Sequence, residues 1–174
     1  MNISEFTEVM YMNFEKLQLS DESKIIEMSK MATEILREHY DPIVGKTQND
    51  YMLKKFQSAD SIRNQLEEGY QYYFVSENGR SIGFLAFYPK TDFMYLSKLY
   101  LYKKERGKGY SRNMLDFVIM KAKEEGLTAI ELNVNKHNST TLIYEKLGFK
   151  ILRSEKNDIG QGYYMDDYVY RLEF

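Results

Sequence analysis

The stretch Tyr95-Leu-Ser-Lys-Leu-Tyr-Leu-Tyr-Lys-Lys-Glu-Arg-Gly-Lys-Gly-Tyr-Ser-Arg-Asn-Met-Leu115 decides the fold of this chain. Its first part, residues 95–102, is rich in leucine and tyrosine and predicts a largely buried strand. Residues 103–112 then hold two glycines and five cations. A run of apolar residues at helical spacing follows, namely Met114, Leu115, Val118, Ile119 and Ala122. A strand, a glycine loop and a helix in this order aim backbone N–H groups and the positive end of the helix at an anion.

Two well-known phosphate-binding motifs do not fit this loop. The Walker pattern requires serine or threonine after Gly-Lys, whereas Gly109 follows Gly107 and Lys108 here. The dinucleotide-binding fingerprint requires a third glycine where this chain has Arg112. The loop is therefore expected to hold its anion in neither of these two ways.

The loop instead resembles the pyrophosphate-binding loop of the GCN5-related N-acetyltransferase (GNAT) family, Arg/Gln-x-x-Gly-x-Gly/Ala, as residues 106–111, with Ser111 in place of the usual last residue. Two later pieces carry the same resemblance in the right order. Glu131-Leu-Asn-Val-Asn135 with Asn138 looks like the family's next strand and helix start, and residues 144–149 match its Tyr-x-x-x-Gly-Phe signature. The resemblance is clear over residues 70–153. Residues 39–52 and 160–168 also resemble a bacterial branch of the family that includes polyamine acetyltransferases.

The composition is that of a globular protein. A length of 174 residues is sufficient for one domain, 1–174, with a proper core. The chain has no apolar run of the ~18 residues that cross a bilayer and no signal-peptide core, so we expect a cytoplasmic protein with no membrane contact. Zero cysteines exclude disulfides and thiolate metal sites, and two histidines argue against a histidine-rich metal site or a Ser-His-Asp triad. A net charge of −2 argues against general nucleic-acid binding.

The order of expected elements predicts an α+β fold with a mixed sheet. We expect strands over 13–19, 70–76, 81–88, 93–102, 128–135, 150–154 and 163–173, and helices over about 21–38, 51–56, 61–68, 110–124 and 139–146. The segments 39–51 and 155–162 are expected to be loops, and Asn78-Gly79 predicts a hairpin turn. The family resemblance adds a GNAT-like sheet in which two adjacent parallel strands splay apart, flanked by helices.

The resemblance implies acetyl-CoA as cosubstrate, with no metal, and gives the cofactor-binding residues by position. The pantetheine arm would lie along a strand edge as an added strand. Backbone amides of the glycine loop would hold the diphosphate while nearby cations balance its charge. The residues implied are Leu99, Tyr100, Leu101, Arg106, Gly107, Lys108, Gly109, Tyr110, Ser111, Arg112 and Asn138.

Acetyl transfer to an amine requires a general acid for the leaving thiolate and a route for the amine proton. Tyr144 is the candidate acid, since a phenol has an ordinary pKa near 10. A backbone N–H on the splayed strand, that of Leu99, would polarise the thioester carbonyl. The general base stays open. Some relatives have a glutamate where this chain has Ser97, and a water relay held by Ser97, Asn133 or a tyrosine is one route, while Glu131 fits a structural role equally well.

The acceptor pocket is expected between residues 39–56 and 160–168, where carboxylates and tyrosines would favour a cationic amine through charge pairing and cation–π contact. The candidate substrate-binding residues are Tyr40, Asp41, Tyr51, Tyr164 and Asp166, with Asp50, Asp167 and Tyr163 nearby. These acids and tyrosines equally fit solvated and packing roles. A peptide N-terminus, a lysine, a polyamine and an aminoglycoside all remain open as acceptors.

Three functions from different classes fit these residues. The first is an N-acetyltransferase that moves the acetyl group from acetyl-CoA to a small-molecule primary amine by direct attack in a ternary complex. The second is a non-catalytic module on the same fold that senses acyl-CoA. The third is an unrelated nucleotide-binding domain that uses the same glycine loop. Either a monomer or a homodimer is compatible with the sequence.

Overall fold

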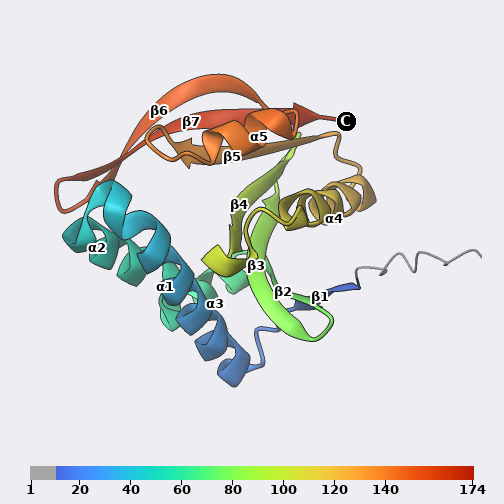
Figure 1. Ribbon diagram of the computed structural model, residues 1–174, viewed down its shortest axis with the longest axis horizontal. Coiled ribbons are helices and arrows are strands. Elements are labelled where there is room, and N and C mark those ends of the chain that lie inside the picture. Colours follow the sequence, from blue (N-terminus) through green and yellow to red (C-terminus); the bar gives the residue numbers. More distant parts are fainter. Residues whose placement is uncertain (1–10) are drawn as a thin grey trace, which may run out of the picture.

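The computed structural model describes residues 11–174 and contains a seven-stranded sheet flanked by helices (Figure 1). The strands lie in the order β1-β2-β3-β4-β5-β7-β6. Their bounds are Met12–Lys16 (β1), Gln71–Glu77 (β2), Arg80–Pro89 (β3), Met94–Leu101 (β4), Ala129–Asn135 (β5), Lys150–Gly160 (β6) and Tyr163–Glu173 (β7). The helices are Glu22–Val44 (α1), Lys46–Gln57 (α2), Ala59–Glu67 (α3), Tyr110–Glu124 (α4) and Thr141–Lys146 (α5), with a 3₁₀ turn, η1, at Lys103–Glu105.

The parallel strands β4 and β5 pair over a short distance and then part. Their register contains only the pairs Met94–Ile130 and Tyr95–Glu131, while every other neighbouring pair in the sheet is antiparallel. Figure 1 shows β5, β7 and β6 crossing the top of the molecule, with β4 approaching them from below. The predicted α+β fold with a splayed parallel pair is therefore confirmed.

A β-bulge lies in β4 just after the strands part. Phe87 of β3 pairs with Leu96, and Ala86 pairs with Lys98, so Ser97 between them has no partner in the register. A bulge bends its strand and redirects the residue that it adds. The backbone at Ser97 is therefore turned at the place where β4 leaves β5.

Two hydrophobic clusters cover the two faces of the sheet because side chains alternate along each strand. On one face the apolar stripe of α4, which includes Met114, Leu115 and Val118, packs against Val75 and Leu85. On the other face, the alternate residues of β2 and β3, such as Phe74 and Phe84, pack against α1 and α3. The expected helix 110–124 is confirmed at both ends, and among residues 11–174 we find no helix with the length and apolarity to cross a membrane.

Two segments expected to be loops are regular structure. Residues 39–51 belong to the end of α1 and the start of α2, so α1 continues through Pro42 to Val44 instead of ending near Glu38. The helix ends only at Gly45, which has a φ of 86° and donates its N–H to the Asp41 carbonyl at 3.0 Å. One proline removes a single helical donor, and the buried apolar stripe of α1 outweighs that loss.

Residues 155–160 continue strand β6 instead of forming a loop, which corrects the second prediction. Lys156 pairs with Asp166 and Asp158 with Tyr164 along the β6–β7 ladder, and the turn is confined to Gln161 and Gly162. Most residues of β6 are exposed, so its sequence lacks the apolar alternation that reveals a half-buried strand.

Gly83 of β3 lies where no side chain fits, and we expect Gly83→Ala to destabilise the fold. A Cβ atom at this position would lie 2.1 Å from the Tyr100 carbonyl oxygen, which belongs to the backbone of β4. Overpacking of this kind costs about 1–3 kcal/mol and sometimes more. Urea denaturation followed by circular dichroism measures the loss, with Ser81→Ala on the exposed start of the same strand as control. Equal midpoints for Gly83→Ala and wild type would contradict this expectation.

Candidate active site

Two cavities meet where β4 and β5 separate. The first, the loop cavity, is lined by β4 residues 96, 97 and 99–101, by residues 132–134 of β5 and by the loop after β4. The second, the tyrosine cavity, has a volume of about 270 Å³ and is lined by residues of α1, α2, α3 and β7 together with both splayed strands. Tyr40, Ser97, Tyr100 and Asn133 line both cavities. The two cavities therefore adjoin at these four residues.

The glycine loop has free backbone donors at the rim of the loop cavity. Gly107 and Gly109 have φ values of 77° and 84°, a region that glycine enters without strain, and α4 begins at the next residue. No side chain caps α4, and no oxygen among residues 11–174 accepts a hydrogen bond from the N–H groups of residues 107–111. Unpaired N–H groups at a helix start bind phosphates. This loop can therefore hold a diphosphate.

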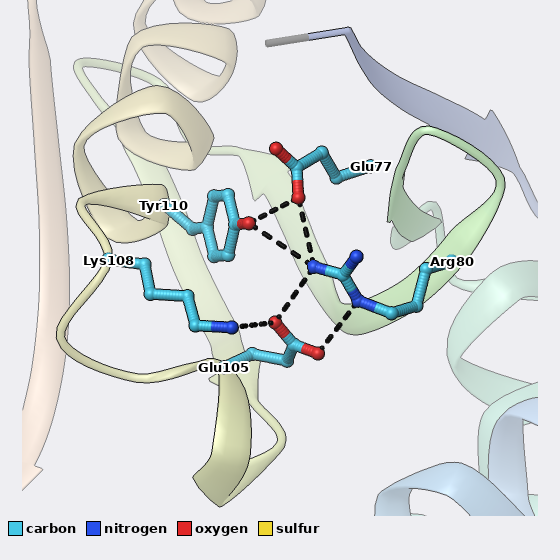
Figure 2. Close-up of polar contacts among 5 residues, drawn as sticks. All are labelled: Glu77, Arg80, Glu105, Lys108 and Tyr110. Carbon is cyan, nitrogen blue, oxygen red and sulfur yellow. Dashed lines mark hydrogen bonds and ion pairs between the residues drawn. The ribbon is translucent and has the colours of Figure 1, made fainter.

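An ion cluster built on two buried carboxylates fixes this loop to the β2–β3 hairpin (Figure 2). The Arg80 guanidinium donates to both Glu105 oxygens, at 2.9 and 3.1 Å, and to Glu77 at 2.9 Å. Lys108 donates to Glu105 at 3.1 Å, and the Tyr110 hydroxyl donates to Glu77. Arg80 also donates to the Tyr110 hydroxyl at 3.3 Å, so the same arginine contacts both ends of the glycine loop directly.

We expect the acid limb of the stability profile to depend on Glu105. The hydrogen bond from Arg80 lowers the pKa of this carboxyl from 4.5 to about 2. A carboxyl with a depressed folded pKa contributes its full stability above its ordinary pKa, and that contribution is lost as the pH falls from about 4.5 to about 2. Glu105→Gln should lower the urea midpoint at neutral pH and flatten its fall in this window. Glu124→Gln, at an exposed ion pair with Lys121, is the control. An unchanged acid slope in Glu105→Gln would contradict the assignment.

A chain of polar side chains crosses the wall of the loop cavity. Arg106 donates to the Leu101 carbonyl and lies 3.4 Å from His39 Nδ1, while His39 Nε2 lies 3.1 Å from Asn138 Oδ1. Asn138 donates in turn to the Tyr40 hydroxyl at 3.4 Å. Burial and the charge of Arg106 lower the pKa of His39, so the neutral imidazole is favoured. His39 thus holds both Arg106 and the Asn138 amide in place.

Asp167 is a buried carboxylate in the tyrosine cavity. It is 2% exposed and accepts a hydrogen bond from Asn133 at 3.4 Å, while Asn133 accepts one from the Tyr95 hydroxyl at 2.9 Å. Burial raises the pKa of Asp167, and the charges of Asp166 and Glu155 add to the shift. A carboxylate with a raised pKa beside a shared wall residue can bind an ammonium group and accept its proton.

Tyr144 lines the loop cavity. Its ring packs edge-on against Phe149 with centroids 5.5 Å apart and lies near Tyr170. No hydrogen bond joins the Tyr144 hydroxyl to another residue between 11 and 174. Burial raises its pKa, so the phenol stays protonated across the physiological range and can donate a proton.

The residues proposed from sequence fall into three groups. Those that line the loop cavity are Ser97, Leu99, Tyr100, Leu101, Arg106, Gly107, Ser111, Asn133, Asn138 and Tyr144. Tyr164 lines the tyrosine cavity, and Tyr40 lines both cavities. Lys108, Gly109, Tyr110, Arg112, Asp41, Tyr51 and Asp166 line neither cavity. The backbone of Gly109 and Tyr110 still belongs to the free N–H groups of the loop.

Other contacts occupy the acceptor candidates of this third group. Asp41 accepts from Asn49 at 2.7 Å, and Asp166 pairs with Lys136 at 2.9 Å. The Tyr51 hydroxyl donates to the Ile159 carbonyl. These three side chains join α1 to α2, β7 to the segment after β5, and α2 to β6.

Neither Glu131, whose role the sequence left open, nor the side chain of Tyr110 faces a cavity. Glu131 accepts a hydrogen bond from Arg171 at 3.0 Å. Tyr110 is 4% exposed and points into the ion cluster. Arg112 is exposed.

The sequence reading did not assign a role to His39 or to Lys98. Lys98 lines the tyrosine cavity from β4, is 6% exposed, and has a pKa that burial lowers to about 7. The signal for Lys98 was available, because it is a single cation among the apolar residues of a strand expected to be buried. His39 was missed because residues 39–51 were expected to form a loop, whereas His39 lies on helix α1.

Comparisons with known proteins point to one family. A family model described as an acetyltransferase (GNAT) domain matches residues 21–163. The ribosomal protein bS18-alanine N-acetyltransferase of Haemophilus influenzae is 29% identical over 100 residues, which are 58% of this chain and 68% of that protein. The chloroplastic GCN5-related N-acetyltransferase 6 of Arabidopsis thaliana is 24% identical over 153 residues, which are 87% of this chain and 47% of that protein.

Solved structures share the fold. The PaiA N-acetyltransferase of Thermoplasma acidophilum, in complex with coenzyme A, superposes with a TM-score of 0.73 at 21% identity and covers 95% of this chain and 100% of its own. The ribosomal-protein-S18-alanine N-acetyltransferase of Escherichia coli has a TM-score of 0.64 at 18% identity and covers 94% of each chain. The family match spans most of the chain and includes the parted strands and the glycine loop. The chain therefore belongs to the GCN5-related N-acetyltransferase family, as the sequence motifs indicated, and is an N-acetyltransferase that uses acetyl-CoA as its cosubstrate.

Proposed function

We propose that this enzyme transfers the acetyl group to the primary amine of a small cationic acceptor, by direct attack within a ternary complex. The observation that carries the proposal is the wall shared by the two cavities at Tyr40, Ser97, Tyr100 and Asn133. A thioester at the inner end of the loop cavity and an amine in the tyrosine cavity would meet at this wall. Direct attack then needs no covalent acetyl-enzyme.

The loop cavity would hold the cosubstrate along its whole length. The N–H groups of residues 107–111 bind the diphosphate, and the free edge of β4 at Leu99 to Leu101 accepts the pantetheine arm as an added strand. The Asn138 amide, fixed by His39, lies within the same cavity to bond that arm. A backbone N–H after the bulge at Ser97 stabilises the oxyanion that forms on the thioester carbonyl.

Asp167 supplies the site for the amine in this proposal. Its carboxylate pairs with the incoming ammonium, and the proton passes to it directly or through a water held by Ser97 and Asn133. The neutral amine then attacks the carbonyl carbon and forms the C–N bond. Collapse of the tetrahedral adduct breaks the C–S bond, and Tyr144 donates its proton to the departing thiolate. The adduct nitrogen then gives its extra proton back to Tyr144, and Asp167 releases its proton to water, so the products are the neutral amide, the CoA thiol and one proton.

The acceptor class is tested by thiol release from acetyl-CoA with a panel of amines. The Haemophilus influenzae relative is named for the alanine of a ribosomal protein, so the panel includes an alanine-initiated peptide beside a lysine derivative, alkylamines, a diamine and an aminoglycoside. We expect release with a small amine and formation of its N-acetyl product by mass spectrometry. Binding of CoA without thiol release for any member of the panel would favour the acyl-CoA sensor. Thiol release with the peptide alone would show that the acceptor is a peptide N-terminus and not a small molecule.

A further inference from the structure

The buried amine of Lys98 belongs to the tyrosine cavity but serves neither proton transfer described above. Its Nζ donates to the Phe56 carbonyl at 3.2 Å, to Gln65 Oε1 at 2.9 Å and to the Tyr72 hydroxyl. Three oxygen acceptors match the three N–H groups of an ammonium. The Phe56 carbonyl also lies at the C-terminal end of α2, where the helix dipole favours a cation. These contacts stabilise the ammonium form against burial, which lowers the pKa of Lys98 to about 7, so the cavity wall is mainly positive here below that pH.

Gln57, the next residue of α2, brings an unpartnered amide oxygen to the same cavity. Its side chain is 7% exposed and lines the tyrosine cavity. Its Oε1 is buried and has no hydrogen-bond partner among residues 11–174. Buried polar groups are nearly always paired, so an unpaired one in a ligand cavity points to a group on the ligand. An unpaired amide oxygen needs a donor, and the N–H or O–H of an uncharged amide or hydroxyl supplies one without a second positive charge beside Lys98.

The charges of the cavity wall restrict how many cations the acceptor can carry. Asp167 on β7 is a buried carboxylate beside Asn133, and Lys98 on β4 is a buried amine beside α2. The amine to be acetylated pairs with Asp167. A second ammonium on the same molecule would be repelled by Lys98 wherever it reached the α2 side of the cavity.

We propose that the acceptor carries a single amine, the one that is acetylated, and an uncharged amide or hydroxyl tail that pairs with Gln57 beside Lys98. The proposal rests on the proposed function, because it describes the far part of the same acceptor. It separates this enzyme from the polyamine acetyltransferases that residues 39–52 and 160–168 resemble. Lys98 acts here as a specificity residue that excludes diamines.

Four five-carbon primary amines test the tail: cadaverine, 5-aminopentanol, 5-aminopentanamide and pentylamine. Their dissociation constants are measured by calorimetry on the CoA-bound protein, at about pH 6.5 so that Lys98 is mainly protonated. We expect the alcohol and the amide to bind at least about tenfold more tightly than cadaverine. Cadaverine binding as tightly as either, or no binding by any of the four, would overturn the proposal. Thiol release is measured separately. An enzyme that binds these amines but transfers no acetyl group is thereby distinguished from one that shows no preference for the alcohol or amide tail.

Two variants and a control separate specificity from a structural role. Lys98→Met should raise the affinity for cadaverine relative to 5-aminopentanol by about tenfold, since the repelling charge is gone. Gln57→Leu should weaken the alcohol and the amide but not pentylamine. Lys90→Met is the control, because Lys90 is exposed over the Tyr88 and Tyr95 rings and does not line the cavity. If both variants change the dissociation constants of all four amines equally, Lys98 and Gln57 have a structural role only and the proposal is refuted.

Discussion

Tyr144→Phe is expected to lower kcat by about 10²- to 10⁴-fold, the usual contribution of a positioned general acid. The substitution removes one hydroxyl and keeps the ring that packs against Phe149 and Tyr170. Without that hydroxyl the thiolate must leave without a proton from the enzyme. CoA affinity should change little, because the diphosphate donors lie in the glycine loop. Single-turnover thiol release and calorimetric titration with CoA measure the two quantities.

Tyr102→Phe is the matched control for this substitution. Tyr102 follows β4, is half-buried and lines neither the loop cavity nor the tyrosine cavity. Its variant should keep the wild-type kcat. If Tyr144→Phe retains full kcat, the proton must come from water or from Tyr40 or Tyr100, and the assignment of Tyr144 falls. A parallel loss of CoA affinity and kcat would instead indicate a binding role.

The fold was predictable where apolar spacing and glycines mark both ends of an element. Helix α4 lies between the glycine loop and Gly126, and its predicted bounds are the observed ones. The end of α1 and the second half of β6 were not predictable by the same reasoning. Pro42 is a conventional stop signal that tertiary packing overrides, and β6 is an exposed edge strand with little apolar pattern.

The site was predictable as far as main-chain motifs determine it. The glycine loop and the Tyr-x-x-x-Gly-Phe signature placed the candidate residues of the loop cavity, because backbone geometry fixes what those motifs present. Which residues line the tyrosine cavity depends instead on which face of its strand each side chain occupies. Asp166 and Asp167 are adjacent, so their side chains lie on opposite faces of the strand. A shift of the strand by one residue would therefore exchange which of the two enters the cavity. Within residues 163–168 each face of the strand carries tyrosine and one aspartate, so the residue types do not show which face is turned to the cavity.

This adjacency provides the second large prediction, because the two aspartates act as test and control. Asp167→Asn should lower kcat/KM for the amine by about 10²-fold or more, since a buried carboxylate that pairs with the ammonium and takes its proton is replaced by a neutral amide. Asp166→Asn should have little effect, because its carboxylate pairs with Lys136 outside the cavity. Steady-state kinetics at saturating acetyl-CoA measure both.

The pH profile tests the same residue independently of the size of the loss. Burial raises the pKa of Asp167 above its ordinary 3.8, so kcat/KM should fall on the acid side with a midpoint above that value as the carboxylate is protonated. Asp167→Asn has no such group and should lose this limb, while Asp166→Asn should keep it. An acid limb that survives in Asp167→Asn belongs to another group, and Asp167 would then be a binding residue at most. A near-complete loss of activity in both variants would point instead to the β7 backbone, since the two side chains lie on opposite faces of one strand.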